Sequence, residues 1–416
     1  MLLEIFIFSL VGTALGIILG LLPGLHLNNV LPILISLSFL IQNPYYLVVL
    51  IVATVIAQVF TSFIPSIFLG APDGDSNSNS LSILPGHRLL LEGRGYEAIK
   101  LTVIGGLGAV MVSTIVILLF GNYFTVIHNV TRPYISYAII TVVLFMIFSE
   151  KQINKILLTG GIILLSGIFG VVTLNSSLVQ QQNILFPVFT GLFAISTLLV
   201  SITEKSNMPE QKTDSKLGIS KSDIVKAIGL SVVAGILVGL LPAIGVSQAA
   251  TFMQYLGGMG QSRPFLVTLS GINTANEVVS LNSLYLISNP RSGASVAIER
   301  ILPQLSMYDM LLFTGVILFT TGLIVPITLY LGKTVPRFLV KVNYNLLSYL
   351  ILGFLVLMIG IMTGGYGLLI GITATSIGVL CAHLGVKRSS CMGVLIVPSV
   401  LFFLGLNPLI FTILNI

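Results

Sequence analysis

The sequence predicts an all-α polytopic membrane protein with two inverted-topology repeats of about seven transmembrane or broken segments each. Three observations lead to this prediction: an apolar composition, long apolar segments on both sides of a polar linker, and a pattern of Gly and Pro that occurs twice. Of the 416 residues, 55% are hydrophobic and 8% are charged, and the mean hydropathy is +1.07. Soluble domains carry roughly 25% charged residues. The modest net charge of +6 gives no sign of a nucleic-acid surface.

Fourteen apolar segments follow one another, and many approach the roughly 20 residues that cross a bilayer. Seven precede the polar run 204–223 and seven follow it. We therefore divide the chain into a first membrane repeat (1–203), a polar cytoplasmic linker (204–223) and a second membrane repeat (224–416). The segments are 2–21, 25–42, 46–69, 98–120, 132–148, 154–174, 185–203, 224–241, 244–258, 264–287, 309–330, 346–363, 366–384 and 393–413.

A helix-breaking pattern occurs once in each half. GIILGLLP at 16–23 recurs as GILVGLLP at 235–242, an offset of 219. The pair Leu84-Pro85 recurs as Leu302-Pro303, an offset of 218. Two patterns at nearly one offset indicate an internal repeat of the kind that builds many transporters. The alternative is that Gly and Pro are simply frequent in membrane helices.

The distribution of Lys and Arg predicts that the two halves have opposite orientations. Under the positive-inside rule, loops rich in these residues face the cytoplasm. Each half then crosses the membrane an odd number of times, so the short segments 25–42 and 244–258 count as crossings. This topology places both termini outside a plasma membrane. The basic regions are 70–97, 149–155, 204–223, 331–345 and 385–392.

Polar residues stand where the repeated pattern breaks each helix. A helix that restarts after a proline presents free N–H groups and the positive end of its dipole, which favour an anion. We therefore expect a substrate site near the middle of the membrane, between the halves. A helix kink with packing glycines is the alternative. The expected substrate-binding residues are Pro23, Gly24, His26, Asn28 and Asn29 in the first half and Ser247 and Gln248 in the second.

The stretch 70–100 interrupts the apolar pattern with Gly, Pro and uncharged polar residues. A bilayer tolerates such backbone only where protein buries it or it lines a watery cavity. We expect it to form part of the site, and an ordinary solvent loop is the alternative. Substrate-binding candidates are Ser76, Asn77, Ser78, Asn79 and Arg88, with Arg291 and Ser292 at the equivalent place in the second half; Asp73 and Asp75 are candidates for a coupling ion or proton. Arg88 also fits as a positive-inside residue.

Glu277 is the clearest single signal, because it lies inside the apolar segment 264–287. A carboxylate at that depth costs roughly 2.5–3.5 kcal/mol on insertion scales and is a functional candidate by default. We expect it to bind a coupling Na⁺ or to carry a proton, with Asn276 and Asn282 among the substrate ligands. A structural hydrogen bond is the alternative. Its counterpart at offset 218 is Val59, so the predicted site is asymmetric.

Enzyme signatures are absent from the sequence. The four histidines are scattered without metal-ligand spacing, and no HExxH, GxSxG or Walker A pattern occurs. We therefore predict a protein that is not an enzyme and not itself an ATP-driven pump. It would have no catalytic residue, metal or cofactor, with Na⁺ or H⁺ entering only as a coupling ion.

Three stretches carry a family resemblance: 12–25 contains a G-x-x-x-G-x-x-P-G-L run, 86–98 is a glycine-bounded segment, and 235–245 repeats the first pattern. In these stretches the chain resembles the large membrane subunit of tripartite tricarboxylate transporters, the TctA family. It departs from the family at His26, where Gly is usual, at 85–88, in lacking a proline before Glu277, and in its short length. Specificity for citrate-like acids is therefore not carried over.

We predict a secondary active transporter (permease) for a small organic anion such as a carboxylate. Na⁺ or H⁺ would drive it, with alternating access around a site between the repeats. The alternative is a translocase for a polyprenyl phosphate, a lipid carrier. An intramembrane enzyme and a scaffold subunit that transports nothing are weaker alternatives. Expected partners are the anion and membrane lipid, without nucleic acid, and a homo-oligomer is compatible with the sequence. The resemblance also implies a small membrane subunit and a soluble binding protein.

Overall fold

The computed structural model is helical and, in the part of the chain that it describes, contains no strand. Seven helices in this part are long and apolar enough to cross a membrane. They are Leu2–Leu21, Pro44–Phe68, Gly95–Thr131, Ile153–Leu174, Lys221–Gly239, Met307–Val335 and Ser348–His383. The all-α class is confirmed. The described residues are 2–22, 27–36, 41, 43–68, 83–148, 150, 152–180, 183–203, 210–212, 217–240, 246, 249–250, 252–253, 262–287, 290, 292–339 and 344–407.

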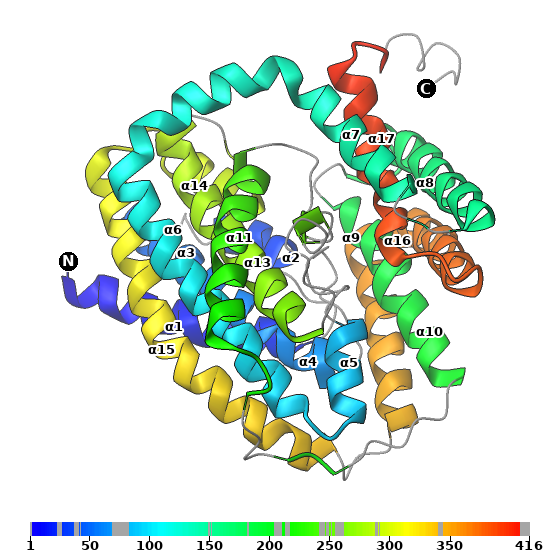
Figure 1. The fold of residues 1–416 in the computed structure, drawn as a ribbon. Helices are drawn as coiled ribbons and strands as arrows, with labels where there is room; N and C mark the ends of the chain where they lie inside the picture. The colour runs from blue at the N-terminus through cyan, green and yellow to red at the C-terminus, as the bar shows by residue number, and fades with distance from the viewer. Residues whose placement is uncertain are drawn as a thin grey trace.

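The helices form two bundles that lie side by side (Figure 1). The first bundle contains α1 (Leu2–Leu21), α2 (Leu27–Ser36), α3 (Pro44–Thr61), α4 (Phe63–Phe68), α5 (Ile83–Leu91), α6 (Gly95–Thr131), α11 (Lys221–Leu240), α13 (Ser262–Ile287), α14 (Gly293–Ile301) and α15 (Met307–Leu339). The second bundle contains α7 (Ile135–Phe148), α8 (Ile153–Leu174), α9 (Leu185–Phe189), α10 (Ser196–Thr203), α16 (Tyr344–His383) and α17 (Gly393–Phe403). Among the described residues, no buried apolar cluster includes side chains from both bundles.

The first bundle takes its helices from both halves of the chain. α1 packs along α3, and α11 packs along α13. α6, from the first half, also packs along α13, where Ser270 Oγ donates to the carbonyl oxygen of Thr102 at 2.6 Å. Nearly every residue of α3 and α13 is buried, so these two helices form the centre of the bundle.

Glycines allow α1 to lie close against α3. A side chain at Gly16 would meet Ala57 and the backbone nitrogen of Gln58. One at Gly20 would meet Thr61 and the carbonyl oxygen of Gln58. The glycines of the first pattern therefore allow a close approach of two helices, and the partner helix is α3.

We expect Gly16→Val to destabilise the protein by roughly 1–3 kcal/mol, the range for overpacking a close contact. The added side chain must push α1 away from the backbone of α3. Thermal unfolding of the purified protein in detergent measures this. Gly161→Val on α8 is the matched control, because no atom lies within 4 Å of a Cβ placed there. Equal unfolding midpoints for the two variants would contradict the close α1–α3 packing.

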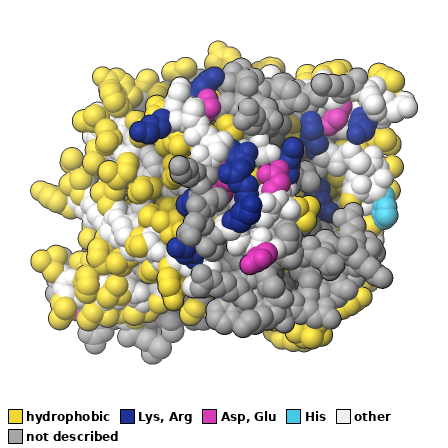
Figure 2. Space-filling view, turned by 60° about the horizontal axis from the view of Figure 1, so that its bottom comes forward, with side chains coloured by type: hydrophobic (Ala, Val, Ile, Leu, Met, Phe, Trp, Pro, Cys, Tyr) yellow, Lys and Arg dark blue, Asp and Glu magenta, His cyan; other side chains and the backbone are white. Residues whose placement is uncertain are grey.

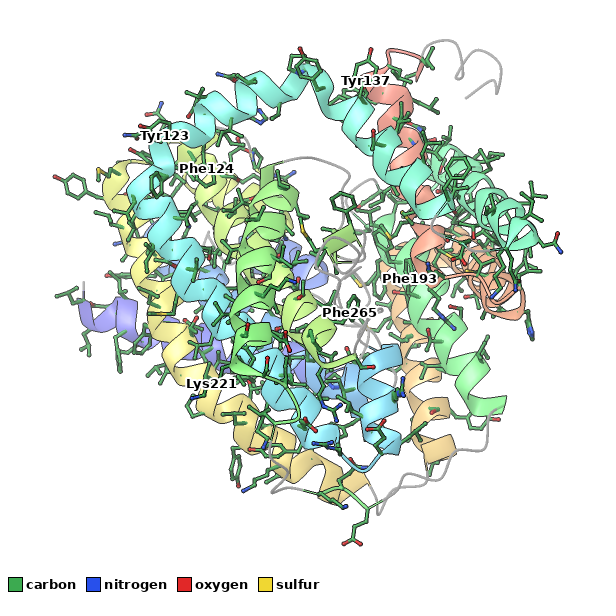
Figure 3. The ribbon with its side chains drawn as sticks, viewed as in Figure 1. Tyr123, Phe124, Tyr137, Phe193, Lys221 and Phe265 are labelled. Atoms are coloured by element: carbon green, nitrogen blue, oxygen red, sulfur yellow. The ribbon has the colours of Figure 1, made fainter. Side chains whose placement is uncertain are left out.

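One predicted helix boundary is wrong. The polar stretch 121–131 was expected to be a loop, but α6 continues through it for 37 residues. A helix of that length measures about 55 Å, against the roughly 30 Å of a bilayer's hydrocarbon core. Between Tyr123 and Tyr137 the chain passes from the first bundle to the second (Figure 3). The predicted break between the segments 346–363 and 366–384 is confirmed, because α16 contains a non-helical kink at Gly364 (φ 67°, ψ −164°).

The structure also corrects one of the two repeated patterns. Pro85 is the third residue of α5, whereas Pro303 lies beyond the end of α14. Within the predicted crossing at 25–42 the structure describes the ten-residue α2, about 15 Å of helix. That is about half of the hydrocarbon thickness.

Candidate functional site

The predicted site residues are only partly covered by the structure. Asn28 and Asn29 belong to the first turn of α2, but their side chains are not described. Pro23, Gly24, His26, Asp73, Asp75, Ser76, Asn77, Ser78, Asn79, Ser247, Gln248 and Arg291 lie outside the described residues. The described candidates are Arg88, Asn276, Glu277, Asn282 and Ser292.

Glu277 lies in the middle of α13 and is partly buried. Asn276 Nδ2 donates to Glu277 Oε1 at 3.3 Å, and Ser280 Oγ donates to Asn276 Oδ1 at 3.5 Å. These three side chains belong to a run of polar residues along a helix that is otherwise packed in apolar surroundings. The sequence prediction of an acid deep in the apolar segment therefore agrees with the structure, and an amide lies beside that acid.

Asn282 is buried on the same helix, with 1% of its surface exposed. Its Nδ2 donates to the carbonyl oxygen of Val278 at 2.8 Å. Its Oδ1 is buried and has no hydrogen-bond partner in the described part of the chain. A buried acceptor without a partner is rare and needs an explanation such as a bound water or ion. This acceptor lies just over one helical turn beyond Glu277.

Gln58 on α3 is a candidate that the sequence analysis missed. Its side chain is buried, and Oε1 accepts a hydrogen bond from the backbone nitrogen of Leu27 at 3.1 Å. Leu27 is the first residue of α2, the helix that restarts after the first break. The first N–H groups of a helix have no partner within it, so Gln58 fixes the start of α2 against α3.

Arg88 and Ser292 have local partners. Arg88 Nε lies 3.5 Å from Glu92 Oε1, and the Arg88 side chain is 75% exposed. Such a surface ion pair contributes little to stability, and its exposure fits the positive-inside interpretation. Ser292 caps α14: its Oγ accepts from the nitrogen of Ser295 at 3.2 Å, and Ser295 Oγ accepts from the nitrogen of Ser292 at 2.8 Å.

A buried carboxylate near the start of α6 joins the two halves of the chain. Glu97 is fully buried, and its Oε1 lies 2.9 Å from Arg263 Nε, near the start of α13. Arg94 Nε lies 2.5 Å from the other carboxylate oxygen. We call Arg94, Glu97 and Arg263 the Glu97 anchor. Figure 2, in which the bottom of Figure 1 comes forward, shows Lys, Arg, Asp and Glu side chains gathered near the middle of the view, with a broad hydrophobic surface to their left.

Part of the predicted linker packs against the same region, where α5 ends and α6 begins. The nitrogen of Gly218 donates to Glu97 Oε1 at 2.7 Å. Gln211 accepts from the nitrogen of Gly95 at 2.9 Å and donates to the carbonyl oxygen of Leu90 at 3.0 Å. Lys221, the first residue of α11, lies at the lower end of the first bundle in Figure 3. The linker therefore contacts the α5–α6 corner at two points.

A second acid near the start of α15 has a similar environment. Asp309 has 6% of its surface exposed, and Oδ2 accepts from both the nitrogen and Oγ of Ser306 at 2.7 Å. It is also hydrogen-bonded to the side chain of Tyr45, near the start of α3. α15 is thus joined to α3 as α6 is joined to α13.

The described residues offer hydrogen-bonding groups and one acid in the centre of the first bundle. They contain no group of three or more His, Cys, Asp or Glu side chains that could hold a metal ion. The central groups can bind a small polar solute or a monovalent cation. The backbone carbonyl oxygens of Gln58 and Asn276 lie against Gly20 near the end of α1 and Gly239 near the end of α11.

Comparison with known proteins gives the family. The model of the tripartite tricarboxylate transporter TctA family matches residues 6–393. An uncharacterized protein of Methanocaldococcus jannaschii is 31% identical over 96% of this chain and 98% of its own length. No solved structure matches. The chain belongs to the tripartite tricarboxylate transporter TctA family and has the membrane transport role of that family.

Proposed function

We propose that the chain is a secondary active transporter for a small organic anion such as a carboxylate, driven by a gradient of Na⁺ or H⁺. The observation that carries the proposal is the position of Glu277, an acid in the middle of a buried helix of a TctA-family chain. A carboxylate there can bind Na⁺ or take up a proton. The start of a broken helix, such as α2, favours an anion. The first bundle thus offers binding groups for both the anion and the coupling ion.

We propose that the halves are inverted repeats, and the packing of α11 on α13 supports this. A side chain at Gly235 would meet Ala275 and the backbone nitrogen of Asn276. One at Gly239 would meet Val279 and the carbonyl oxygen of Asn276. These contacts repeat those of α1 with α3, position by position. The offset is 219 between the glycine helices and 218 between their partners.

The two buried acids supply independent support for the repeats. Glu97 and Asp309 are each the third residue of their helices, and each has an ionic or hydrogen-bonding partner three positions earlier. The cross-helix partners, Arg263 and Tyr45, are each the second residue of theirs. Each half therefore contributes a long helix that is anchored to the central helix of the other half. Such an exchange of helices between the two halves is expected of inverted repeats.

Movement of one bundle against the other would provide the alternating access. The separate apolar clusters of the two bundles favour such movement, because no large shared core opposes it among the described residues. The covalent connections are the α6–α7 crossing, the linker and the segment between α15 and α16. Under the positive-inside rule the linker is cytoplasmic, both termini are outside and the protein resides in the plasma membrane.

The family name suggests two further partners, a small membrane subunit and a soluble binding protein. In that assembly the binding protein would deliver the anion to the outer face. We propose no cofactor, and Na⁺ or H⁺ would be a transported substrate.

Uptake into proteoliposomes tests the proposal. The purified chain is reconstituted, alone and with its small membrane subunit and binding protein, and is offered labelled di- and tricarboxylates under imposed Na⁺ or H⁺ gradients. We expect accumulation that stops when an ionophore collapses the gradient. A ligand that binds the folded state also raises the unfolding midpoint, so the acid that accumulates should stabilise the protein. Folded protein that neither accumulates nor binds any acid in either preparation would overturn the proposal.

A further inference from the structure

The glycine contacts place Gln58 and Asn276 at equivalent positions of the two halves. In each half the backbone nitrogen of this residue lies against one glycine of the neighbouring helix, and its carbonyl oxygen lies against the next glycine. Val59 is therefore the counterpart of Glu277, as expected from the sequence, and the preceding residue in each half carries a side-chain amide.

α3 and α13 also contact each other. Gly106 of α6 packs against both Phe60 and Thr274, which brings these two side chains together. The symmetry-equivalent pair is Ile56 with Val278, and both side chains belong to one apolar cluster. Positions 56 and 60 share one face of α3, as 274 and 278 share one face of α13. Residues 58 and 276 lie on the opposite face of their helices, so the two halves place the amides equivalently, each on the side away from this contact.

The two amides hold different groups. Gln58 Oε1 accepts from the nitrogen of Leu27, which fixes the start of α2. Asn276 Nδ2 donates to Glu277 Oε1, which fixes one carboxylate oxygen. One amide thus orients the helix end that favours an anion, and the other orients the acid that favours a cation or proton.

We infer that Gln58 and Asn276 are paired positioning residues of the transport site, Gln58 for the anion and Asn276 for the coupling ion. This inference rests on the proposed function. The physical reason for an amide at position 58 is that it accepts a hydrogen bond from α2 without a negative charge. A carboxylate in the same place would make the same hydrogen bond but would repel a bound anion.

Two substitutions at position 58 separate the substrate role from a structural one. Gln58→Leu removes the acceptor, and Gln58→Glu keeps it but adds a charge. Losing one hydrogen bond that orients the anion site is expected to raise the KM for carboxylate uptake about tenfold in Gln58→Leu. Gln58→Glu keeps the acceptor, so hydrogen exchange at the start of α2 is expected to match the parent while KM rises at least as much; the buried carboxylate itself lowers the unfolding midpoint. A purely structural cap predicts a normal KM in Gln58→Glu, which would overturn the inference.

Asn276 is tested through the coupling ion. Asn276→Leu is expected to raise the Na⁺ concentration or lower the pH needed for half-maximal uptake about tenfold, with a smaller change in the KM for the acid. Thr54→Val is the matched control on α3, because Thr54 Oγ1 bonds only to the carbonyl oxygen of Leu50 in its own helix at 2.7 Å. Equal effects of Asn276→Leu on acid and ion would contradict the division of roles.

Hydrogen exchange distinguishes failure of this inference from failure of the proposed function. Exchange at the start of α2 is expected to rise in Gln58→Leu and to match the parent in Thr54→Val. Unchanged exchange in Gln58→Leu would overturn the positioning role even if the parent transports acids. If the parent takes up no acid although exchange responds as expected, the proposed function has failed. The hydrogen bond by which Gln58 fixes the start of α2 would then be confirmed. The role of Gln58 in substrate binding would be overturned together with the proposed function.

Discussion

Replacing Glu277 with Gln is expected to abolish the dependence of carboxylate uptake on the ion gradient. In a coupled carrier the bound ion raises the affinity for the substrate, by a coupling factor that is typically about 5–150-fold. The introduced amide is similar in shape to the carboxylate and can keep the contact with Asn276, but it can neither neutralise Na⁺ nor carry a proton at this position. The measurement is initial uptake in proteoliposomes with and without the gradient. The ratio of the two rates should fall to about one.

Glu299→Gln on α14 is the control, because it removes the same charge from a helix next to α2 and outside the polar run of α13. It should leave the ratio of rates unchanged. Gradient-driven accumulation that survives in Glu277→Gln would leave the carrier in place and would reduce Glu277 to a structural hydrogen-bonding group. Loss of exchange down a concentration gradient in the same variant would indicate a folding defect, which the unfolding midpoint would reveal.

The helical class could be predicted because apolar length is a direct physical requirement for crossing a bilayer. Helix ends were predicted less well, because polar composition alone does not stop a helix. The stretch 121–131 contains Gly121 and Asn122, yet the helix continues to Thr131, just before Arg132-Pro133. The residue before a proline disfavours the α conformation. The proline therefore predicts the end of α6 better than the preceding polar residues do.

A charged site residue could be predicted where burying its charge is costly, whereas the uncharged Gln58 could not be predicted. Glu277 was identified because an acid inside an apolar segment is costly. Gln58 lies in an equally apolar segment, but an uncharged amide has a weaker signal, and its partner Leu27 is 31 residues away in the sequence. Glu97 was missed because it precedes the apolar segment 98–120 and resembles a loop charge. Glu97 is buried because α13 packs against α6, and the spacing of residues in the sequence does not predict that contact.

Replacing Glu97 with Ala is expected to destabilise the protein by about 3–5 kcal/mol, the range for breaking a buried ion pair from one side. The loss leaves the guanidinium groups of Arg94 and Arg263 without their shared carboxylate, and the nitrogen of Gly218 without its acceptor. Thermal or denaturant unfolding in detergent measures the effect. Glu92→Ala is the control. The Glu92 carboxylate lies 3.9 Å from Arg263, but its side chain is 43% exposed, so it should contribute less than about 1 kcal/mol.

A double-mutant cycle separates the ion pair from the packing around it. Arg263→Leu alone should also destabilise, because Glu97 keeps only Arg94 as a charged partner. Glu97→Ala combined with Arg263→Leu should cost less than the sum of the single changes, since the double variant buries neither charge unpaired. Additive losses would mean that the two residues act independently. The Glu97 anchor would then not be what holds α6, and with it the first half of the chain, to α13.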